Sequence, residues 1–112
     1  MEEAKLNALR KGLLEPLILA IASAEKVYVA DIVERLGATD FATKEGTLYP
    51  LLSKMRRERL LDYEWRESAS GPPRKYYRTT EAGARELAIT RAYLASITTL
   101  IDELRNEHAP SG

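Results

Sequence analysis

The hydrophobic period of the chain changes sharply near Leu61, and this change limits the folds that the sequence can adopt. Ahead of it, apolar residues recur at spacings of three and four, which predicts a helix with one buried stripe. Over residues 61–66 apolar and charged residues alternate instead, as in a strand with one buried face. The residues of the helical stripe are Leu48, Leu51, Leu52 and Met55. Residues 45–78 are therefore expected to form a helix that leads directly into a β-hairpin.

The expected hairpin has a proline-rich loop and a positively charged tip. Its second strand is predicted over residues 75–79, where tyrosines suit a pleated surface. Residues 68–73, with one glycine and two prolines, are expected to form a loop that continues neither strand and brings Arg74 and Lys75 to the tip. Packing is the expected role of the aromatic residues, with ligand binding or base stacking as the alternative. They are Tyr63, Trp65, Tyr76 and Tyr77.

The first helix is expected over residues 4–24, where apolar residues again follow helical spacing. Pro16 has no backbone N–H, and its ring clashes with the preceding turn of a helix. It therefore predicts a kink or a fresh start near Gly12, so that the segment consists of two helical pieces.

A short second helix is predicted over residues 28–36, and Gly37 is expected to end it in the left-handed conformation that glycine tolerates. Residues 38–43 then form a connecting loop. The third helix carries the apolar stripe described above. It is expected to begin near Thr47, because Pro50 is best tolerated close to a helix start.

The last helix is predicted over residues 81–106, with Thr80 as its N-cap, and residues 108–112 form a flexible tail. Its apolar residues follow a heptad-like spacing, and Ile89, Tyr93 and Leu100 add a second face. A terminal helix needs only one apolar face to dock on its own core, so the surplus predicts a homodimer. The residues expected at the dimer interface are Leu87, Leu94, Ile97, Ile101 and Leu104. The alternative is a helix that only folds back on its own domain.

Length and composition predict one folded unit. A chain of 112 residues is about one domain, and 45% hydrophobic with 30% charged residues is ordinary for a folded protein. The absence of cysteine excludes disulfides and thiolate metal sites. The longest apolar run, residues 17–22, is far shorter than the roughly 20 residues of a membrane span, and the acidic N-terminus does not resemble a signal peptide. The protein is therefore expected to be cytoplasmic.

The charges are unevenly distributed, although 17 Lys and Arg residues balance 17 Asp and Glu residues. Residues 44–78 contain nine cations and five anions, a net charge of +4, so the rest of the chain carries the compensating −4. A basic face of this kind is typical of proteins that bind nucleic acids. Charge alone is equally consistent with a solvated helix that has no partner.

The sequence offers no catalytic motif. No carboxylate pair or glycine-rich phosphate loop stands out, and the only histidine, His108, lies in the tail. We therefore expect neither an enzyme nor a bound metal or cofactor.

Four sequence motifs, taken in order, resemble the PadR family of bacterial transcriptional regulators. They are RKGLLE at residues 10–15, TLYP at 47–50, GPPRKYY at 71–77 and TEAG at 80–83. The resemblance implies a mainly α fold with a small β-hairpin (α+β), namely a winged helix-turn-helix with a long C-terminal dimerisation helix. It also implies a repressor that a small molecule or another signal releases from its operator. The chain departs from the family's pattern at residues 28–31, where the family often has a Tyr-Gly-Tyr-Glu type of sequence.

This reading divides the chain into a DNA-binding winged helix-turn-helix at residues 1–80, a dimerisation helix at 81–107 and the tail at 108–112. A small-molecule pocket is expected at the dimer interface, bordered by the N-terminal helix and by Tyr93, Leu94 and Ile97, although packing explains these residues equally well. Winged helices also serve as protein-interaction modules without DNA contact, which is the alternative function.

A winged helix-turn-helix places its third helix in the major groove of double-stranded DNA. The residues of that helix expected to contact base edges or phosphates are Lys44, Thr47, Tyr49, Ser53, Lys54 and Arg57. Arg57 is the best candidate for reading guanine, because its planar guanidinium can donate two parallel hydrogen bonds. Arg74 and Lys75 would reach adjacent phosphates or the minor groove. A symmetric dimer should place its two recognition helices ~34 Å apart on a palindromic operator.

Overall fold

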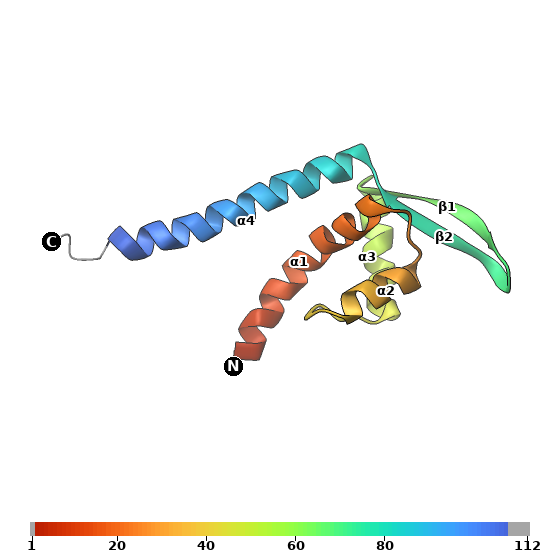
Figure 1. Cartoon of the computed structure of the whole chain (residues 1–112), viewed down its shortest axis with the longest axis horizontal. Coiled ribbons are helices and arrows are strands. Elements are labelled where there is room, and N and C mark those ends of the chain that lie inside the picture. The colour runs from red at the N-terminus through yellow and green to blue at the C-terminus, as the bar shows by residue number, and fades with distance from the viewer. Residues whose placement is uncertain (1, 108–112) are drawn as a thin grey trace.

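The structure is a computed structural model that describes residues 2–107, which form four helices and one β-hairpin (Figure 1). The elements are α1 (Glu2–Ala24), α2 (Val29–Gly37), α3 (Glu45–Arg57), β1 (Leu61–Ser68), β2 (Gly71–Thr79) and α4 (Glu81–Glu107). The predicted fold, a mainly helical winged helix-turn-helix with a long C-terminal helix, is confirmed. The residues predicted to form a tail, 108–112, lie outside the described part.

The hydrophobic core lies where the second half of α1, α2, α3 and the base of the hairpin meet. Its largest fully buried side chains are Ile18, Leu19, Val27, Ile32, Leu48, Leu52, Met55 and Leu61. Burial of each such side chain contributes about 1.5–3 kcal/mol. Two backbone hydrogen bonds, of 3.0 and 2.6 Å, join Val27 to Tyr77 and so attach the hairpin to the segment between α1 and α2.

α1 is a single helix of 23 residues that contains Pro16, so the prediction of two helical pieces is wrong. Leu14 and Leu17, on either side of the proline, pack against the core, and Ile18 is fully buried. These contacts keep the helix continuous at Pro16, where one backbone hydrogen bond is missing. Packing contributes more to helix stability than local propensity does.

α2 begins and ends within one residue of its predicted bounds, but the left-handed ending predicted for Gly37 is wrong, because Gly37 has no positive φ. Thr39 terminates the helix instead. Its backbone N–H and its hydroxyl donate to the Leu36 carbonyl at 2.9 and 2.8 Å. The terminal carbonyl is thereby satisfied without a reversal of the chain at the glycine.

α3 begins at Glu45, two residues earlier than predicted, so that Pro50 lies in its second turn. The Lys44 carbonyl accepts the first hydrogen bonds, from Thr47 at 3.1 Å and from Leu48 at 3.3 Å. Pro50 is exposed, so its ring displaces no core side chain. The helix therefore begins ahead of the proline, at the Lys44 carbonyl that accepts these first backbone bonds.

A hydrogen-bonded turn ends α3 with a non-glycine residue in the left-handed region, since Arg59 has φ 63°. The N–H of Arg59 donates to Arg56 at 3.0 Å, and that of Leu60 donates to Met55 at 2.9 Å. This is the pattern of a Schellman ending, in which glycine usually takes the position of Arg59. The turn leads the chain from α3 directly into β1.

The hairpin is longer than predicted, because the two prolines belong to β2 rather than to a loop. Arg66 pairs with Arg74 and Ser68 with Gly71, with a bulge between the two pairs. Proline can occupy a bulge in a two-stranded sheet because its missing N–H costs no ladder hydrogen bond there. The prediction that residues 68–73 continue neither strand is therefore wrong.

α4 starts as predicted at a Thr80 N-cap, whose hydroxyl accepts the N–H of Gly83 at 3.0 Å. The helix projects away from the other elements (Figure 1), and the molecule extends over 69 × 33 × 21 Å. The radius of gyration is 17.7 Å, whereas a compact chain of this length has about 13 Å. None of the described helices is both long and apolar enough to span a bilayer.

Candidate nucleic-acid interface

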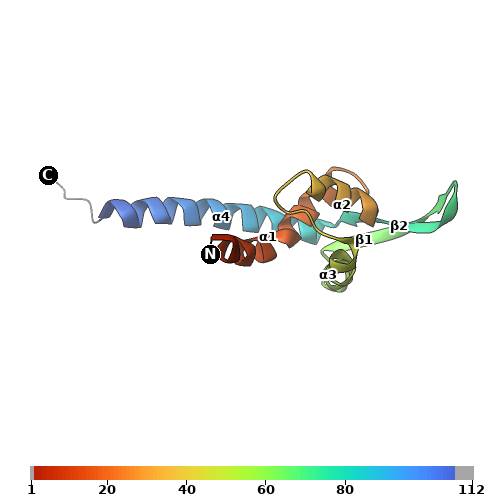
Figure 2. The same cartoon turned by 90° about the horizontal axis from the view of Figure 1, so that it is seen from below.

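The outward face of α3 carries the predicted contact residues in an accessible position. Seen from below, α3 and α2 lie on opposite sides of the base of the hairpin (Figure 2). Thr47, Tyr49, Ser53 and Arg57 are exposed. Leu48, Leu52 and Met55, on the inner face, are all 0% exposed, and Leu51 is half-buried. The register read from the apolar stripe is therefore correct, and the base contacts stay a prediction.

Lys54 is exposed but already paired within the chain. Its ammonium Nζ lies 2.8 Å from the Glu15 carboxylate of α1. The hydrogen bond to Glu15, together with the charges of Glu15 and Glu58, raises the pKa of Lys54. Lys54, which is predicted to bind DNA from α3, thus already forms an ion pair with α1.

Tyr49 is positioned by the first turn of its own helix. Its hydroxyl donates to the Glu45 carboxylate at 3.2 Å, one helical turn away. Partial burial and then the hydrogen bond and charge of Glu45 raise the pKa of Tyr49. The phenol therefore stays protonated at neutral pH and keeps its hydrogen for donation.

A cleft of about 510 Å³ separates the first turns of α3 from the hairpin. We call it the wing cleft. Its aromatic and cationic lining residues are Tyr28, Tyr49, Trp65, Tyr77, Arg74 and Lys75. Asp31 accepts the backbone N–H of Tyr28 at 3.2 Å, which fixes the start of α2 at the edge of the cleft. The cleft and the outward face of α3 form one continuous surface, because Tyr49 belongs to both.

The cations of the hairpin lie over aromatic rings. The Arg74 guanidinium is 4.6 Å from the centroid of the Tyr28 ring. The Lys75 ammonium is 4.7 Å from the ring of Tyr63 and 5.4 Å from that of its cross-strand partner Trp65. Cation–π contacts of this kind restrict long side chains while leaving their charge uncompensated. The sequence reasoning missed them, although the strand pairing of Trp65 with Lys75 contains the signal.

An ion pair fixes the base of the hairpin. Lys26, between α1 and α2, donates from Nζ to Glu64 of β1 at 2.7 Å. Arg66 contacts the same carboxylate at 3.1 Å. The hydrogen bonds from Lys26 and then Arg66 lower the pKa of Glu64. The hairpin is thus attached to the helical part by charge as well as by its backbone bridge to Val27.

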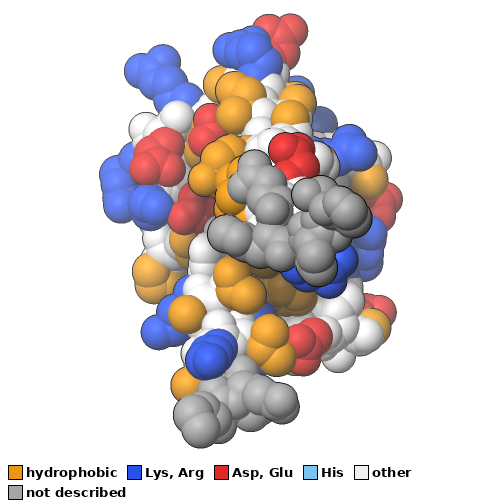
Figure 3. Space-filling model, turned by 90° about the vertical axis from the view of Figure 1, so that its left-hand side faces the viewer, with side chains coloured by type: hydrophobic (Ala, Val, Ile, Leu, Met, Phe, Trp, Pro, Cys, Tyr) orange, Lys and Arg blue, Asp and Glu red, His pale blue; other side chains and the backbone are white. Residues whose placement is uncertain are grey.

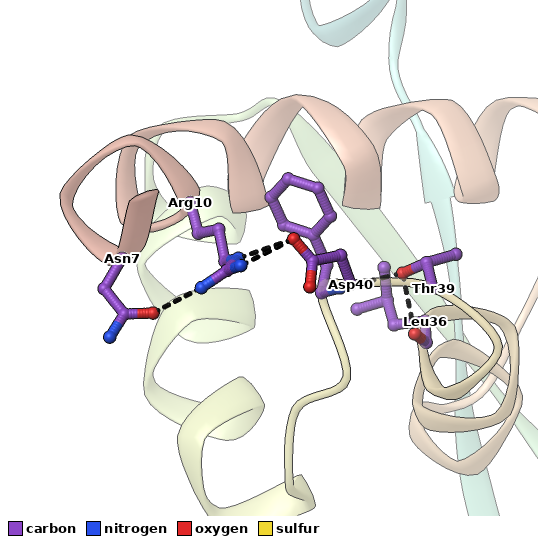
Figure 4. A network of polar contacts seen from close by, with 6 residues as sticks. Asn7, Arg10, Leu36, Thr39 and Asp40 are labelled. Carbon is purple, nitrogen blue, oxygen red and sulfur yellow. Dashed lines mark hydrogen bonds and ion pairs between the residues drawn. The ribbon is translucent and has the colours of Figure 1, made fainter. Parts of the chain in front are cut away.

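A second ion pair connects α1 to the loop that precedes α3 (Figure 4). Arg10 donates from Nε and Nη2 to one oxygen of Asp40, at 2.9 and 2.7 Å, and from Nη1 to Asn7 at 2.6 Å. Thr39, which precedes Asp40, donates a hydrogen bond from its hydroxyl to the Leu36 carbonyl at the end of α2. The loop is therefore held from both sides, which fixes the point from which α3 starts.

The predicted dimerisation residues differ in exposure. Leu87 and Ile97 are half-buried, and Leu87 packs against the core of its own chain. Leu94, Ile101 and Leu104 are 41%, 59% and 50% exposed. Leu6 and Leu9 of α1, which the helical spacing places in a buried stripe, are exposed as well, so that expectation is wrong for the first turns of the helix. The end of the molecule toward which α4 extends accordingly shows hydrophobic side chains among charged ones (Figure 3).

Comparisons with known proteins agree with this geometry. Residues 18–89 match the model of a family described as "Transcriptional regulator PadR-like family". The structure of a PadR-like transcription factor from Bacteroides fragilis is 37% identical, with 90% of this chain and 98% of that chain covered and a TM-score of 0.79. A PadR family transcriptional regulator from Eggerthella lenta is 32% identical, with 91% and 89% covered and a TM-score of 0.83. Bacillus subtilis PadR in complex with operator DNA is 22% identical, with 68% and 44% covered and a TM-score of 0.63, which shows a shared fold alone.

Proposed function

Because the chain belongs to the PadR-like family of transcriptional regulators, we propose that it binds double-stranded DNA as a homodimer and regulates transcription from a palindromic operator. The observation that carries this proposal is the outward face of α3, which is exposed over its whole length while Leu48, Leu52 and Met55 of the opposite face are fully buried. A helix presented in this way fits the major groove.

On this proposal, α3 supplies the base contacts and the hairpin supplies phosphate or minor-groove contacts. Arg57 is exposed near the end of α3, where its guanidinium can donate two hydrogen bonds to guanine. Arg74 and Lys75 lie across the wing cleft from Tyr49, so one duplex against this surface meets all three. The aromatic rings beneath Arg74 and Lys75 do not neutralise the charges of these two side chains, which remain available to phosphates.

The homodimer is proposed from the apolar surface of α4. Leu94, Ile101 and Leu104 follow a heptad-like spacing and are each at least two-fifths exposed. The alternative in which α4 only folds back on its own domain accounts for Leu87, which packs on the core, but not for these three. A second copy of the helix covers them, with Leu6 and Leu9 of α1 beside them.

We further propose that the protein acts in the cytoplasm, not as an enzyme but as a repressor whose DNA affinity an effector lowers. Support comes from the resemblance to PadR repressors and from the position of Tyr93, Leu94 and Ile97 on the face assigned to the dimer. The ion pair between Arg10 and Asp40 joins α1 to the loop before α3. A ligand that shifts α1 at the dimer interface would therefore also shift the recognition helix.

The test is binding of the purified full chain to duplex DNA over a range of salt concentrations, followed by genomic footprinting. The proposal predicts binding that weakens steeply with salt and a small set of palindromic sites. Salt-insensitive or absent DNA binding would favour the alternative, a winged-helix module for protein interaction. A footprint upstream of the protein's own gene and of a neighbouring gene would indicate the operator and the class of effector.

A further inference from the structure

A groove of about 680 Å³ lies where the end of α3 meets the first turn of α4. We call it the arginine groove. Four arginines and two acidic residues line it, namely Arg56, Arg57, Arg59, Arg85, Asp62 and Glu81. It is separate from the wing cleft, which lies at the opposite, N-terminal end of α3.

None of these four arginines has an anionic partner in the part of the chain that the structure describes, since no ion pair there involves them. Arg56 lies over the Tyr63 ring instead, 5.1 Å from its centroid. Asp62, in contrast, already has a cation, since Nη2 of Arg78 lies 3.9 Å from its carboxylate. The groove therefore has an excess of positive charge that the protein itself does not neutralise.

Backbone contacts fix the two helix ends from which these arginines project. The Thr80 hydroxyl donates to the Arg59 carbonyl at 2.6 Å and also caps α4 by accepting the N–H of Gly83. Gly83 lies so close to the Leu60 carbonyl that no side chain would fit there. The end of α3 and the start of α4 are thus joined, and the arginines from both converge before any ligand arrives.

We propose that the arginine groove binds a backbone phosphate of the duplex that α3 contacts. The inference rests on the proposed DNA-binding function. Arg57 lies both on the outward face of α3 and in the groove, so a duplex against that face brings its sugar-phosphate backbone past Arg59 and Arg85. Guanidinium groups bind phosphate oxygens through two parallel hydrogen bonds.

The shape of the groove favours a phosphate on a polymer over a free anion. All four arginines are exposed, so the groove opens on the surface rather than enclosing a ligand. Phosphate contacts of this kind position a protein on DNA without reading sequence. The groove would therefore hold the C-terminal end of α3 in register while the hairpin holds its N-terminal side.

The experiment compares Arg85→Ala with Arg91→Ala, which removes the same charge from the same helix outside the groove. Binding to an operator duplex and to a random-sequence duplex is measured across salt concentrations. Arg85→Ala should flatten the slope of log affinity against log salt by about 1 for each lost contact, hence by about 2 for a dimer. Near ~0.15 M salt this corresponds to about thirty-fold weaker binding to both duplexes. Arg91→Ala should leave slope and affinity unchanged.

A gain-of-binding variant tests the same groove from the opposite direction. Glu81→Gln removes a negative charge from the lining of the groove. It should strengthen binding to both duplexes by a few-fold, because the Glu81 carboxylate would repel a phosphate bound there. Wild-type slope and affinity in both Arg85→Ala and Glu81→Gln, with unchanged sedimentation, would overturn the groove while leaving DNA binding intact. Absence of salt-dependent binding by the wild-type chain would instead overturn the proposed function.

Discussion

The winged helix-turn-helix, from α1 to β2, and the C-terminal helix α4 differ in how much apolar surface one chain can bury. Among the residues that the structure describes, the 13 buried hydrophobic ones all lie between Ile18 and Tyr77, and α4 contributes none of them. Six of the ten large hydrophobic side chains that remain exposed lie on α4. The core is thus formed almost without α4, of which Leu87 packs against it, whereas the rest of α4 presents an apolar surface that one chain leaves open. The single chain and the proposed functional unit, a homodimer, therefore differ in how much apolar surface they bury.

The largest expected effect comes from charge on the open surface of α4. The double variant Leu94→Glu/Ile101→Glu should be monomeric, because carboxylates cannot be buried in an apolar helix pair without a partner. Loss of the second DNA-binding site should weaken operator binding about 10²–10⁴-fold, since the avidity of two linked sites is of this size. Sedimentation equilibrium and operator binding measure the two effects.

The matched control is Leu52→Ala in the complete core. Leu52 is 0% exposed, so its truncation should lower the free energy of unfolding by about 2–5 kcal/mol and leave the dimer interface intact. An intact dimer in the Leu94→Glu/Ile101→Glu variant would show that α4 is complete in one chain, and the contrast between the two regions would be lost.

Gly83 tests the junction between the two regions. A Cβ at this position would overlap the Leu60 carbonyl oxygen and approach Cγ2 of Thr79 to 2.8 Å. Gly83→Ala should therefore lower the free energy of unfolding by roughly 1–3 kcal/mol, although alanine favours helices. Gly12→Ala is the control, because no atom lies within 4 Å of a Cβ added there, and it should stabilise α1 by about 0.5–1 kcal/mol. Chemical denaturation measures the free energy of unfolding of both variants. Equal stabilisation by the two would show that the Leu60 carbonyl leaves room for a Cβ at position 83.

Within the proposed DNA-binding surface, Arg57 and Lys75 should behave differently. Arg57→Ala should weaken operator binding by about 1–3 kcal/mol and binding to random DNA by less, because base contacts carry sequence information. Lys75→Ala should weaken both and flatten the salt dependence, as expected for a phosphate contact. Arg91→Ala serves as the control, since it removes an exposed cation of α4 that belongs to neither α3 nor the hairpin. Equal losses on operator and random DNA for Arg57→Ala would remove its base-reading role.

The sequence predicts the register of α3 and the bounds of α4 well, because each depends on a periodic pattern within one element. Leu48, Leu52 and Met55 are buried at the predicted spacing, and Thr80 caps α4. The features that were missed depend on contacts between distant segments. Lys54 meets Glu15 across 39 positions of sequence, and Arg10 meets Asp40 across 30. Local patterns contain no information about such pairs, and they also fail at Pro16, where packing on the core overrides propensity.

The smallest expected effect separates stability from binding at Arg59, which joins α3 to β1 with φ 63°. An L-residue other than glycine costs about 1–2 kcal/mol in this conformation. Arg59→Gly should therefore raise the free energy of unfolding by up to about 1 kcal/mol, because glycine also gains entropy in the unfolded chain. The same variant removes a cation from the arginine groove and should weaken DNA binding. Arg59→Ala removes that charge but keeps the strained backbone, so it should weaken DNA binding to the same extent without the gain in stability. Denaturation midpoints that do not differ between the two variants would show that the turn is unstrained, whereas unchanged DNA affinity in both would place Arg59 outside the phosphate contact.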